Sequence, residues 1–462
     1  MTRKQNAKLA AVIAETGWSQ PKVAGAVVRV AAEAGAEELT AVTRSHIAMW
    51  MAGTRPSGRA PRILCETLSR RLQRPVTPAE IGLDAPHTSG DGACEWHVDT
   101  LTALVDLGSK NVDVDRRRLL AEAAYSVGGL ALPQQQWWDA APGNARSRIP
   151  TTGRRVGASE INAVREVTEF FSRRDQRQGG IDGRTALHQY IYDDVASYLG
   201  GTFASDETRN RFLATAAEAV YLAGWMSFDA SQHEAARRYF TLAVKLAAEA
   251  DDDPLAGHIL RAMAHQATDL GHPKQAVDLA SASVDRRRYT LASQRERALL
   301  GVVRARSLAT NGQKQEARRA LLRAEDDLAA AKSGDEEPTR VWFFSEASLA
   351  HETARTLWVL GDLSGAESEF WRSVRTRKAD TFSRTHAVTL GYLGALKAQQ
   401  GSVEAACDVW GQALDVMQGV QSGRARESVI TMRRMLSPYR NRGISAAAEI
   451  DARARELLGR VA

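Results

Sequence analysis

One spacing recurs through the second half of the chain. A small residue is followed seven positions later by a turn glycine, five further on by a small residue and four further on by an apolar residue. The turn glycines of the four clearest copies are Gly271, Gly312, Gly361 and Gly401. A looser copy runs Ala223, Ala230, Ala235, Tyr239. Small residues allow two helix backbones to approach closely, and glycine adopts positive φ easily. Each copy therefore predicts a helical hairpin.

The five turn positions, 230, 271, 312, 361 and 401, lie 41, 41, 49 and 40 residues apart. A period of this size predicts a solenoid of helical hairpins. The pattern resembles tetratricopeptide repeats, stretched beyond their usual length of about 34 residues. The longest interval contains SGDEEPTRVWFF (333–344). We expect the solenoid to depart from regularity there, with this segment packed on the groove or on a second subunit.

The N-terminal part of the chain carries most of the excess positive charge. The whole chain has a formal net charge of +6. Residues 1–85 contain 12 Lys and Arg against 7 Asp and Glu, which accounts for +5 of it. A basic terminal module on a near-neutral body indicates a nucleic-acid-binding head.

Apolar periodicity and caps predict five short helices in this head: 6–15, 19–35, 44–53, 61–72 and 75–83. In the third, Ile47, Trp50 and Met51 face the core, so Arg44 and Met49 face outward. This arrangement is typical of a helix-turn-helix domain of the Cro/repressor (XRE) type, whose second paired helix enters the major groove. The connection 35–42 is longer than the usual turn of this motif.

In that geometry Arg44 and Ser45 are the residues that meet base edges. The start of the preceding helix contacts a phosphate through backbone N–H groups and polar side chains. Arg55 and Arg59 are phosphate contacts, or belong to an extended arm 55–59 that reaches the minor groove. The predicted DNA-contacting residues are Ser19, Gln20, Thr43, Arg44, Ser45, His46, Met49, Arg55 and Arg59. The alternative is a small bundle whose arginines only solubilise it.

The head also resembles a particular family through TRSHIAMWMAGTRPSGRAPRILCETLSRRLQRP (43–75), in which Trp50, Gly53, Arg55-Pro56 and 68–71 are the recognisable positions. The chain is similar to actinobacterial XRE-type regulators with a tetratricopeptide body. The similarity continues through 172–184 and 224–240. It implies a transcriptional regulator, in a family partly tied to development and antibiotic production.

The expected fold is all-α: an N-terminal helix-turn-helix bundle followed by a tetratricopeptide-like α-solenoid. We assign the bundle to 1–84, a connecting region to 85–158 and the repeat domain, for sensing and dimerisation, to 159–462. Residues 85–95 are rich in Gly, Ser and Pro and predict a hinge. One helix is expected near 115–130, and 133–158 show no periodic pattern.

The remaining composition excludes several classes of protein. The three cysteines are far apart, which excludes a disulfide framework and suits the cytoplasm. No apolar run reaches the ~18 residues that span a bilayer. We find no catalytic or nucleotide-binding motif and no metal-ligand spacing among the histidines, so we expect no enzyme activity, no cofactor and no metal site.

Extending the repeat register predicts which side chains line the concave groove. They are His258, Arg261, His265, Arg306, His351, Arg355 and Trp358. This lining suits a ligand that combines a carboxylate or phosphate with an apolar part, such as a peptide C-terminus. The alternative is that these side chains pair with acidic residues on neighbouring helices, such as Asp269 and Glu352.

These features lead to two functional hypotheses. In the first, the protein is a homodimeric, sequence-specific DNA-binding regulator that binds double-stranded DNA and senses a peptide or small anionic effector, as the peptide-sensing tetratricopeptide regulators of Gram-positive bacteria do. In the second, it is a protein-docking adaptor whose head is not a DNA reader.

Overall fold

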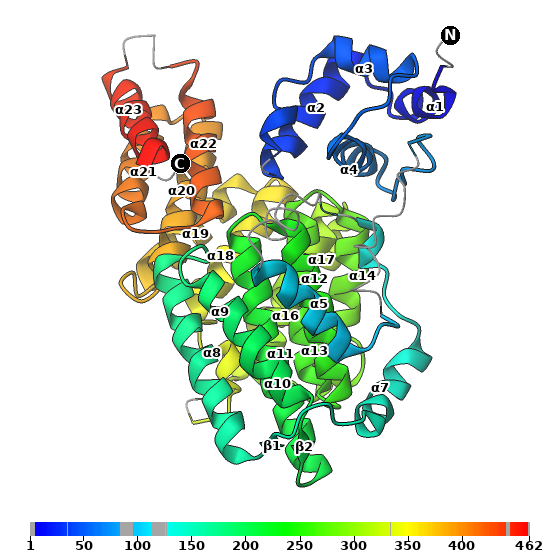
Figure 1. The fold of residues 1–462 in the computed structure, drawn as a ribbon. Coiled ribbons are helices and arrows are strands. Elements are labelled where there is room, and N and C mark those ends of the chain that lie inside the picture. Colours follow the sequence, from blue (N-terminus) through cyan, green and yellow to red (C-terminus); the bar gives the residue numbers. More distant parts are fainter. Residues whose placement is uncertain are drawn as a thin grey trace.

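The computed structural model describes residues 5–34, 36–83, 96–112, 125, 127–332, 334–439 and 444–460. Across these residues the fold is all-α except for one pair of two-residue strands (Figure 1). None of the helices described is long and apolar enough to cross a membrane. The expected hinge 85–95 and residues 115–124 of an expected helix lie outside the described residues.

The head contains α1 (Ala7–Glu15), α2 (Gln20–Glu33), the 3-10 helix η1 (Glu37–Leu39), α3 (Arg44–Met51) and α4 (Ala60–Leu72). Its apolar side chains form a core of their own, separate from that of the body. The 3-10 turn η1 fills the long connection between α2 and α3. The fifth helix expected at 75–83 is wrong: after Pro75 the chain makes turns, and Thr77 Oγ1 accepts from Glu80 N at 3.3 Å.

The connecting region is more regular than its sequence suggests. It contains α5 (Thr100–Val112), the 3-10 helix η2 (Val127–Leu130) and α7 (Gln135–Ser147). Helix α7 forms where no periodicity was visible, although it includes Pro142. Trp137 donates to Trp96 O at 2.8 Å, and Arg288 stacks on Trp138 at 4.1 Å. Aromatic anchoring on neighbouring elements therefore holds a segment that lacks an amphipathic pattern.

The body begins with β1 (Arg155–Val156), the long α8 (Ala158–Gln178), α9 (Arg184–Tyr190), the π-helical η3 (Ile191–Val195), α10 (Ala196–Leu199) and β2 (Thr202–Phe203). The two strands pair in parallel, with Val156 opposite Phe203.

Five tetratricopeptide-like helical hairpins follow. They are α11 (Asp206–Asp229) with α12 (His233–Glu249), α13 (Asp253–Asp269) with α14 (Pro273–Ser283), α16 (Gln294–Thr310) with α17 (Lys314–Ala330), α18 (Glu346–Leu360) with α19 (Leu363–Thr376), and α20 (Ser383–Gln399) with α21 (Val403–Met417). The short α15 (Arg287–Thr290) precedes α16, and α22 (Gly423–Leu436) and α23 (Ser445–Arg460) end the body.

The repeat spacing marks the hairpin turns. The four turn glycines have positive φ, between 79° and 88°. A Cβ added to Gly394 would lie 2.4 Å from Trp410, so a small residue is required there. In the first copy the predicted turn position is one residue too early, because the positive φ, 60°, belongs to Ser231 rather than Ala230. Its close contact is correspondingly Gly224 against Phe240.

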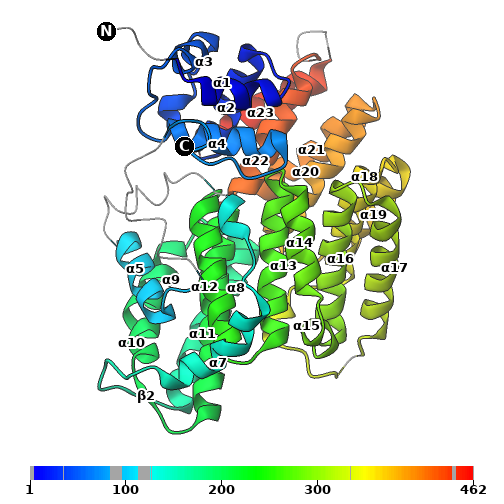
Figure 2. The ribbon, with the colours of Figure 1, turned by 90° about the vertical axis from the view of Figure 1, so that its right-hand side faces the viewer.

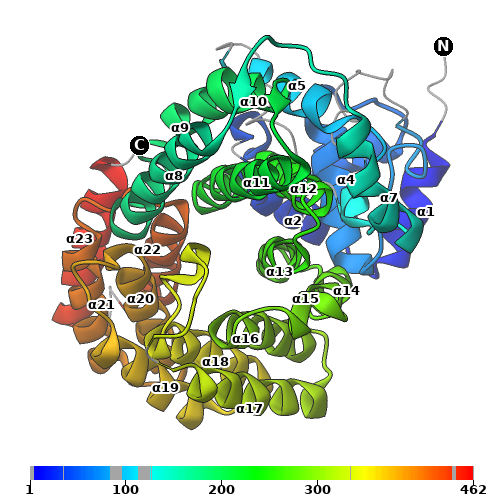
Figure 3. The same ribbon diagram turned by 90° about the horizontal axis from the view of Figure 1, so that it is seen from below.

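The hairpins follow one another around a ring, and α8 meets α20 where the ring closes (Figure 3). Arg384 on α20 donates to Asp175 Oδ2 of α8 at 2.9 Å and to Asp229 Oδ1 of α11 at 3.2 Å. The backbone N of Gln421 donates to Gln178 O at 2.6 Å. Buried ion pairs and backbone hydrogen bonds between elements far apart in the sequence therefore close the ring.

The insertion between α17 and α18 runs along the inner side of the ring. Its 3-10 helix η4 (Thr339–Val341) precedes Trp342, whose Nε1 donates to Ser172 Oγ of α8 at 3.0 Å. The Trp342 ring also stacks on Phe382. Of the two expected placements, packing on the groove is the one that the described residues 334–344 show.

The head lies at one end of the body, with α4 toward the body and α3 on the far side (Figures 1 and 2). Glu66 of α4 and His272, which precedes α14, are both almost fully buried, with Oε1 and Nε2 2.7 Å apart. The ring of Tyr125 stacks on that of His272. The head is therefore docked through α4 and leaves α3 uncovered.

Candidate functional site

The first candidate surface is the outward face of α3. Ile47 and Trp50 are buried in the head core, as expected. Arg44 and Ser45 are exposed at the first turn, and Met49 is 45% exposed on the same helix. Thr43 and His46 cap this end of the helix, since Thr43 N donates to His46 Nδ1 at 3.1 Å. The surface therefore has one cation, one hydroxyl and one flexible apolar side chain near a helix N-terminus.

The side chains expected to contact phosphates differ in whether they already have a partner within the head. Ser19 precedes α2 and its side chain makes no capping bond, while Gln20 Nε2 lies 3.6 Å from Met51 Sδ. Arg55 is exposed. Arg59, in contrast, donates to Glu38 through Nε at 2.9 Å and Nη2 at 2.6 Å. Arg59 is thus neutralised within the head.

The second candidate site is the interior of the ring, where charged side chains are buried and paired. His258 Nδ1 lies 3.2 Å from Glu296 Oε1, and Arg340 of the insertion donates to the same oxygen at 2.7 Å. Arg340 also donates to Glu218 at 3.2 Å. Burial opposes ionisation of Glu296, but Arg340 and His258 outweigh it and lower the pKa of Glu296 to about 2. Arg340 therefore anchors the insertion to α16 and α11.

Three of the other six residues expected in the groove, His265, Arg306 and Arg355, also have acidic partners. Arg306 is paired with Asp269 and, at 3.3 Å, with Glu352. Arg355 Nη2 lies 3.3 Å from the same Asp269 carboxylate. His265 lies between these carboxylates, 3.4 Å from Asp269 and 3.8 Å from Glu352. The pairing with Asp269 and Glu352 that the sequence left open is present in the structure.

His351 and Trp358 make neutral contacts. His351 Nδ1 lies 2.8 Å from Thr389 Oγ1, and burial holds the pKa of this imidazole well below its usual value. Trp358 Nε1 donates to Gln399 Oε1 at 2.8 Å. Both side chains link the hairpin α18–α19 to α20.

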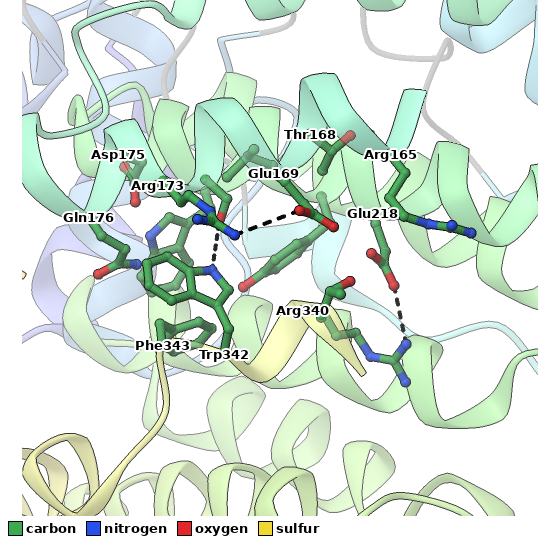
Figure 4. A pocket seen from close by; sticks show the side chains of 15 residues that line it. Arg165, Thr168, Glu169, Arg173, Asp175, Gln176, Glu218, Arg340, Trp342 and Phe343 are labelled. Atoms are coloured by element: carbon green, nitrogen blue, oxygen red, sulfur yellow. Dashed lines mark hydrogen bonds and ion pairs between the residues drawn. The ribbon is translucent and has the colours of Figure 1, made fainter. Parts of the chain in front are cut away.

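One cavity lies between α8, α11 and the insertion (Figure 4). Its volume is about 100 Å³. Tyr221, Trp225, Trp342 and Phe343 supply aromatic surface. Charged side chains at its edge are largely paired, as in the Arg340–Glu218 bond that the figure shows. This cavity suits a flat apolar group.

A second cavity, of about 70 Å³, is lined by Phe343, Phe344 and residues of α13, α16, α18 and α20. Three residues that the register placed in the groove, Arg261, His265 and His351, line it. His258, Arg306, Arg355 and Trp358 do not.

Arg377, which the repeat register did not select, also lines this second cavity. It follows the last residue of α19, at the end of the second helix of its hairpin, whereas the repeat register selects positions on first helices only. Burial, together with the nearby Arg384 charge, lowers the pKa of Arg377 to about 10. No feature of the local sequence distinguishes it from the exposed Arg375.

Within the described residues no group of three or more His, Cys, Asp or Glu side chains is arranged to hold a metal ion. The charged side chains of the ring interior are instead paired mainly with one another.

Comparison with known proteins gives a family match for the head alone. Residues 9–84 match a family model described as the SP15 N-terminal domain. No curated protein matches the chain.

Two solved structures are similar to it at low identity. The TPR-like repeats of a putative kinesin light chain from Podosopora anserina are 20% identical, over 44% of this chain and 94% of that one, with a TM-score of 0.32. A Rap protein complexed with competence and sporulation factor is 14% identical, over 78% of this chain and 87% of that one, with a TM-score of 0.38.

Proposed function

We propose that this protein is a cytoplasmic transcriptional regulator of the XRE type: its head binds a DNA sequence through α3, and its repeat body binds an effector in the ring interior. The observation that carries the proposal is the exposed first turn of α3, which contains Arg44 and Ser45. Helix α3 itself lies on the side of the head away from the body (Figure 1). A recognition helix needs this freedom to enter a major groove.

The base contacts follow from side-chain chemistry. Arg44 matches the two acceptors of guanine, and Ser45 donates to or accepts from several bases. Ser19, Gln20 and Arg55 contact the backbone phosphates on either side. Arg59, bound to Glu38, holds the segment after α3 in place and contributes less to DNA affinity than an open arginine does.

A single head of this size buries limited DNA surface, so specific binding requires two heads. We propose a homodimer that places two copies of α3 on half-sites about one helical turn, or a multiple of it, apart. The contact between Glu66 of α4 and His272 of the body links the ring directly to the head.

Selection of DNA fragments from genomic DNA by the purified full-length protein, followed by gel shifts with competitor DNA, tests the proposal. We expect one class of fragments, including the protein's own upstream region, to survive competition. If all fragments compete equally, the head is not a specific reader.

The second candidate function is a protein-docking adaptor, in which the ring and the helical hairpins bind a partner protein. The neutralisation of Arg59 by Glu38 favours it, because it leaves Arg55 as the exposed arginine of the segment after α3. Equal competition by all fragments, together with a stoichiometric partner in pull-downs that survives nuclease treatment, is the result that this function predicts.

A further inference from the structure

The second cavity is lined by two buried arginines, Arg261 and Arg377, that lack an acidic partner. Arg261 is 2% exposed, and its guanidinium makes hydrogen-bond contacts with Tyr221 Oη at 2.7 Å, His258 Nε2 at 3.2 Å and His258 O at 3.3 Å. It also lies over the rings of Tyr221 and Trp225. Arg377 is 7% exposed and donates to Ala347 O at 2.8 Å and Ser373 Oγ at 3.1 Å. Among the described residues neither has a carboxylate within ion-pair distance.

The neighbouring arginines, in contrast, have carboxylate partners. Arg384 and Arg424, which line the same cavity, are paired with Asp175 and Asp229. Arg306 is paired with Asp269 and with Glu352, which also lines the cavity, and Arg355 is paired with the same Asp269. These four arginines therefore have carboxylate partners, whereas Arg261 and Arg377 have none within ion-pair distance.

Burying an arginine without a counter-charge is costly, and proteins usually pair or expose it. The Nε of Arg377 also lacks a hydrogen-bond partner although it is buried. An oxyanion in the cavity would supply the missing counter-charge, because a carboxylate or phosphate accepts hydrogen bonds from guanidinium groups.

The rest of the cavity wall defines what the anion is attached to. Leu299, Val303, Phe344, Val388 and Trp225 supply the apolar part of the cavity wall. The insertion forms part of this wall, so a ligand would contact the segment that interrupts the repeat.

We propose that this cavity binds an oxyanion carried on an apolar body, with Arg261 and Arg377 contacting the anion and Leu299, Val303 and Phe344 contacting the apolar part. The proposal deepens the effector-binding part of the proposed function and is independent of whether the head binds DNA.

Calorimetry with the full-length protein and four probes tests it. N-acetyl-L-phenylalanine represents an organic acid, acetyl-Ala-Phe a peptide C-terminus and phenyl phosphate a phosphate monoester, while N-acetyl-L-phenylalaninamide is the matched neutral compound. We expect at least one acid to bind at least about tenfold more tightly than the amide. The acid that binds best identifies the source of the anion. Equal binding of acids and amide, or no binding into the millimolar range, overturns the proposal.

Variants place the binding in the cavity. Arg377→Gln and Arg261→Gln are each expected to weaken the best acid about tenfold or more, whereas Arg375→Gln, two residues from Arg377 but exposed, leaves it unchanged. Retained affinity in both cavity variants overturns the assignment.

A ligand-free measurement tests the charge imbalance separately. Ser373 Oγ and Ala347 O stay hydrogen-bonded to each other without Arg377, so Arg377→Met is expected to leave Tm unchanged or to raise it by about 2–4 °C. A clear fall in Tm contradicts the claim that Arg377 carries an unbalanced charge. DNA binding enters none of these measurements, so a protein that binds the acids but no DNA keeps this inference and loses the proposed DNA function.

Discussion

His272 Nε2 lies 2.7 Å from Glu66 Oε1, and this contact joins the head to the turn between α13 and α14. Both side chains are almost fully buried. Glu66 also accepts from Arg70 Nε at 2.8 Å, and Arg70 in turn contacts Glu33 of α2. A short chain of polar contacts therefore runs from the body into the helix that supports α3.

The first prediction concerns this contact. Glu66→Gln removes a buried carboxylate that two partners require, so we expect the head to be loosened and the free energy of unfolding to fall by about 1–3 kcal/mol. Hydrogen exchange of the amides around the α13–α14 turn is the direct measurement, and we expect it to become faster. Glu37→Gln, on an exposed position of the head, is the control. Unchanged exchange in Glu66→Gln means that the contact does not hold the head.

The second prediction concerns closure of the ring. Arg384→Met leaves Asp175 and Asp229 without their shared buried arginine, although Arg424 still contacts Asp229. We expect a loss of about 3–5 kcal/mol in unfolding free energy and a larger radius of gyration by small-angle scattering. Arg319→Gln, on a 74% exposed side chain, should change neither. An unaltered scattering curve for Arg384→Met would show that the ring closes without this cluster.

The third prediction is a pH dependence. Burial opposes ionisation of Glu352, but Arg306 and His265 outweigh it and lower the pKa of Glu352 from 4.5 to about 2. A lowered folded-state pKa contributes stability above the ordinary pKa, and this stability is lost as the pH falls toward the folded pKa. We expect wild type to lose about 3 kcal/mol more than Glu352→Gln between about pH 5 and pH 2, measured by urea unfolding. Parallel curves for the two proteins would rule this out.

The fourth prediction tests the repeat spacing. A Cβ at Gly394 would lie 2.4 Å from Trp410, so Gly394→Ala should cost about 1–3 kcal/mol by overpacking. Gly25, inside α2, has open space where its Cβ would be. Gly25→Ala should therefore stabilise the protein by about 0.5–1 kcal/mol. Thermal unfolding of both variants compares the two cases, and equal effects would contradict the close approach at Gly394.

The spacing predicted the hairpins because its physical cause is local. A small residue on each helix and a positive φ at the turn are properties of short segments. Gly271 has the positive φ of a turn, and Gly394 is a small residue at a close approach of two helices. The looser first copy failed by one residue because Ser231, rather than a glycine, takes the positive φ.

Other features depend on contacts between distant segments, which no local pattern encodes. The meeting of Asp175 with Arg384 requires the ring to close, and the helix α7 depends on aromatic contacts made elsewhere. Only the structure shows that Arg377 lines a cavity and that no carboxylate of the described residues lies within ion-pair distance of it. The sequence could place Arg261 in the groove, but it could not show which arginines lack a partner.

The central claim is that α3 reads DNA, and the most direct measurement is the affinity of Arg44→Ala for a selected fragment and for random DNA. We expect specific binding to weaken by about 1–3 kcal/mol with relaxed preference at one base pair, and nonspecific binding to change little. Arg55→Ala should weaken both and reduce the salt slope by about 1. If Arg44→Ala weakens specific and nonspecific binding in the same proportion, or if wild type prefers no sequence, α3 is not the reading helix.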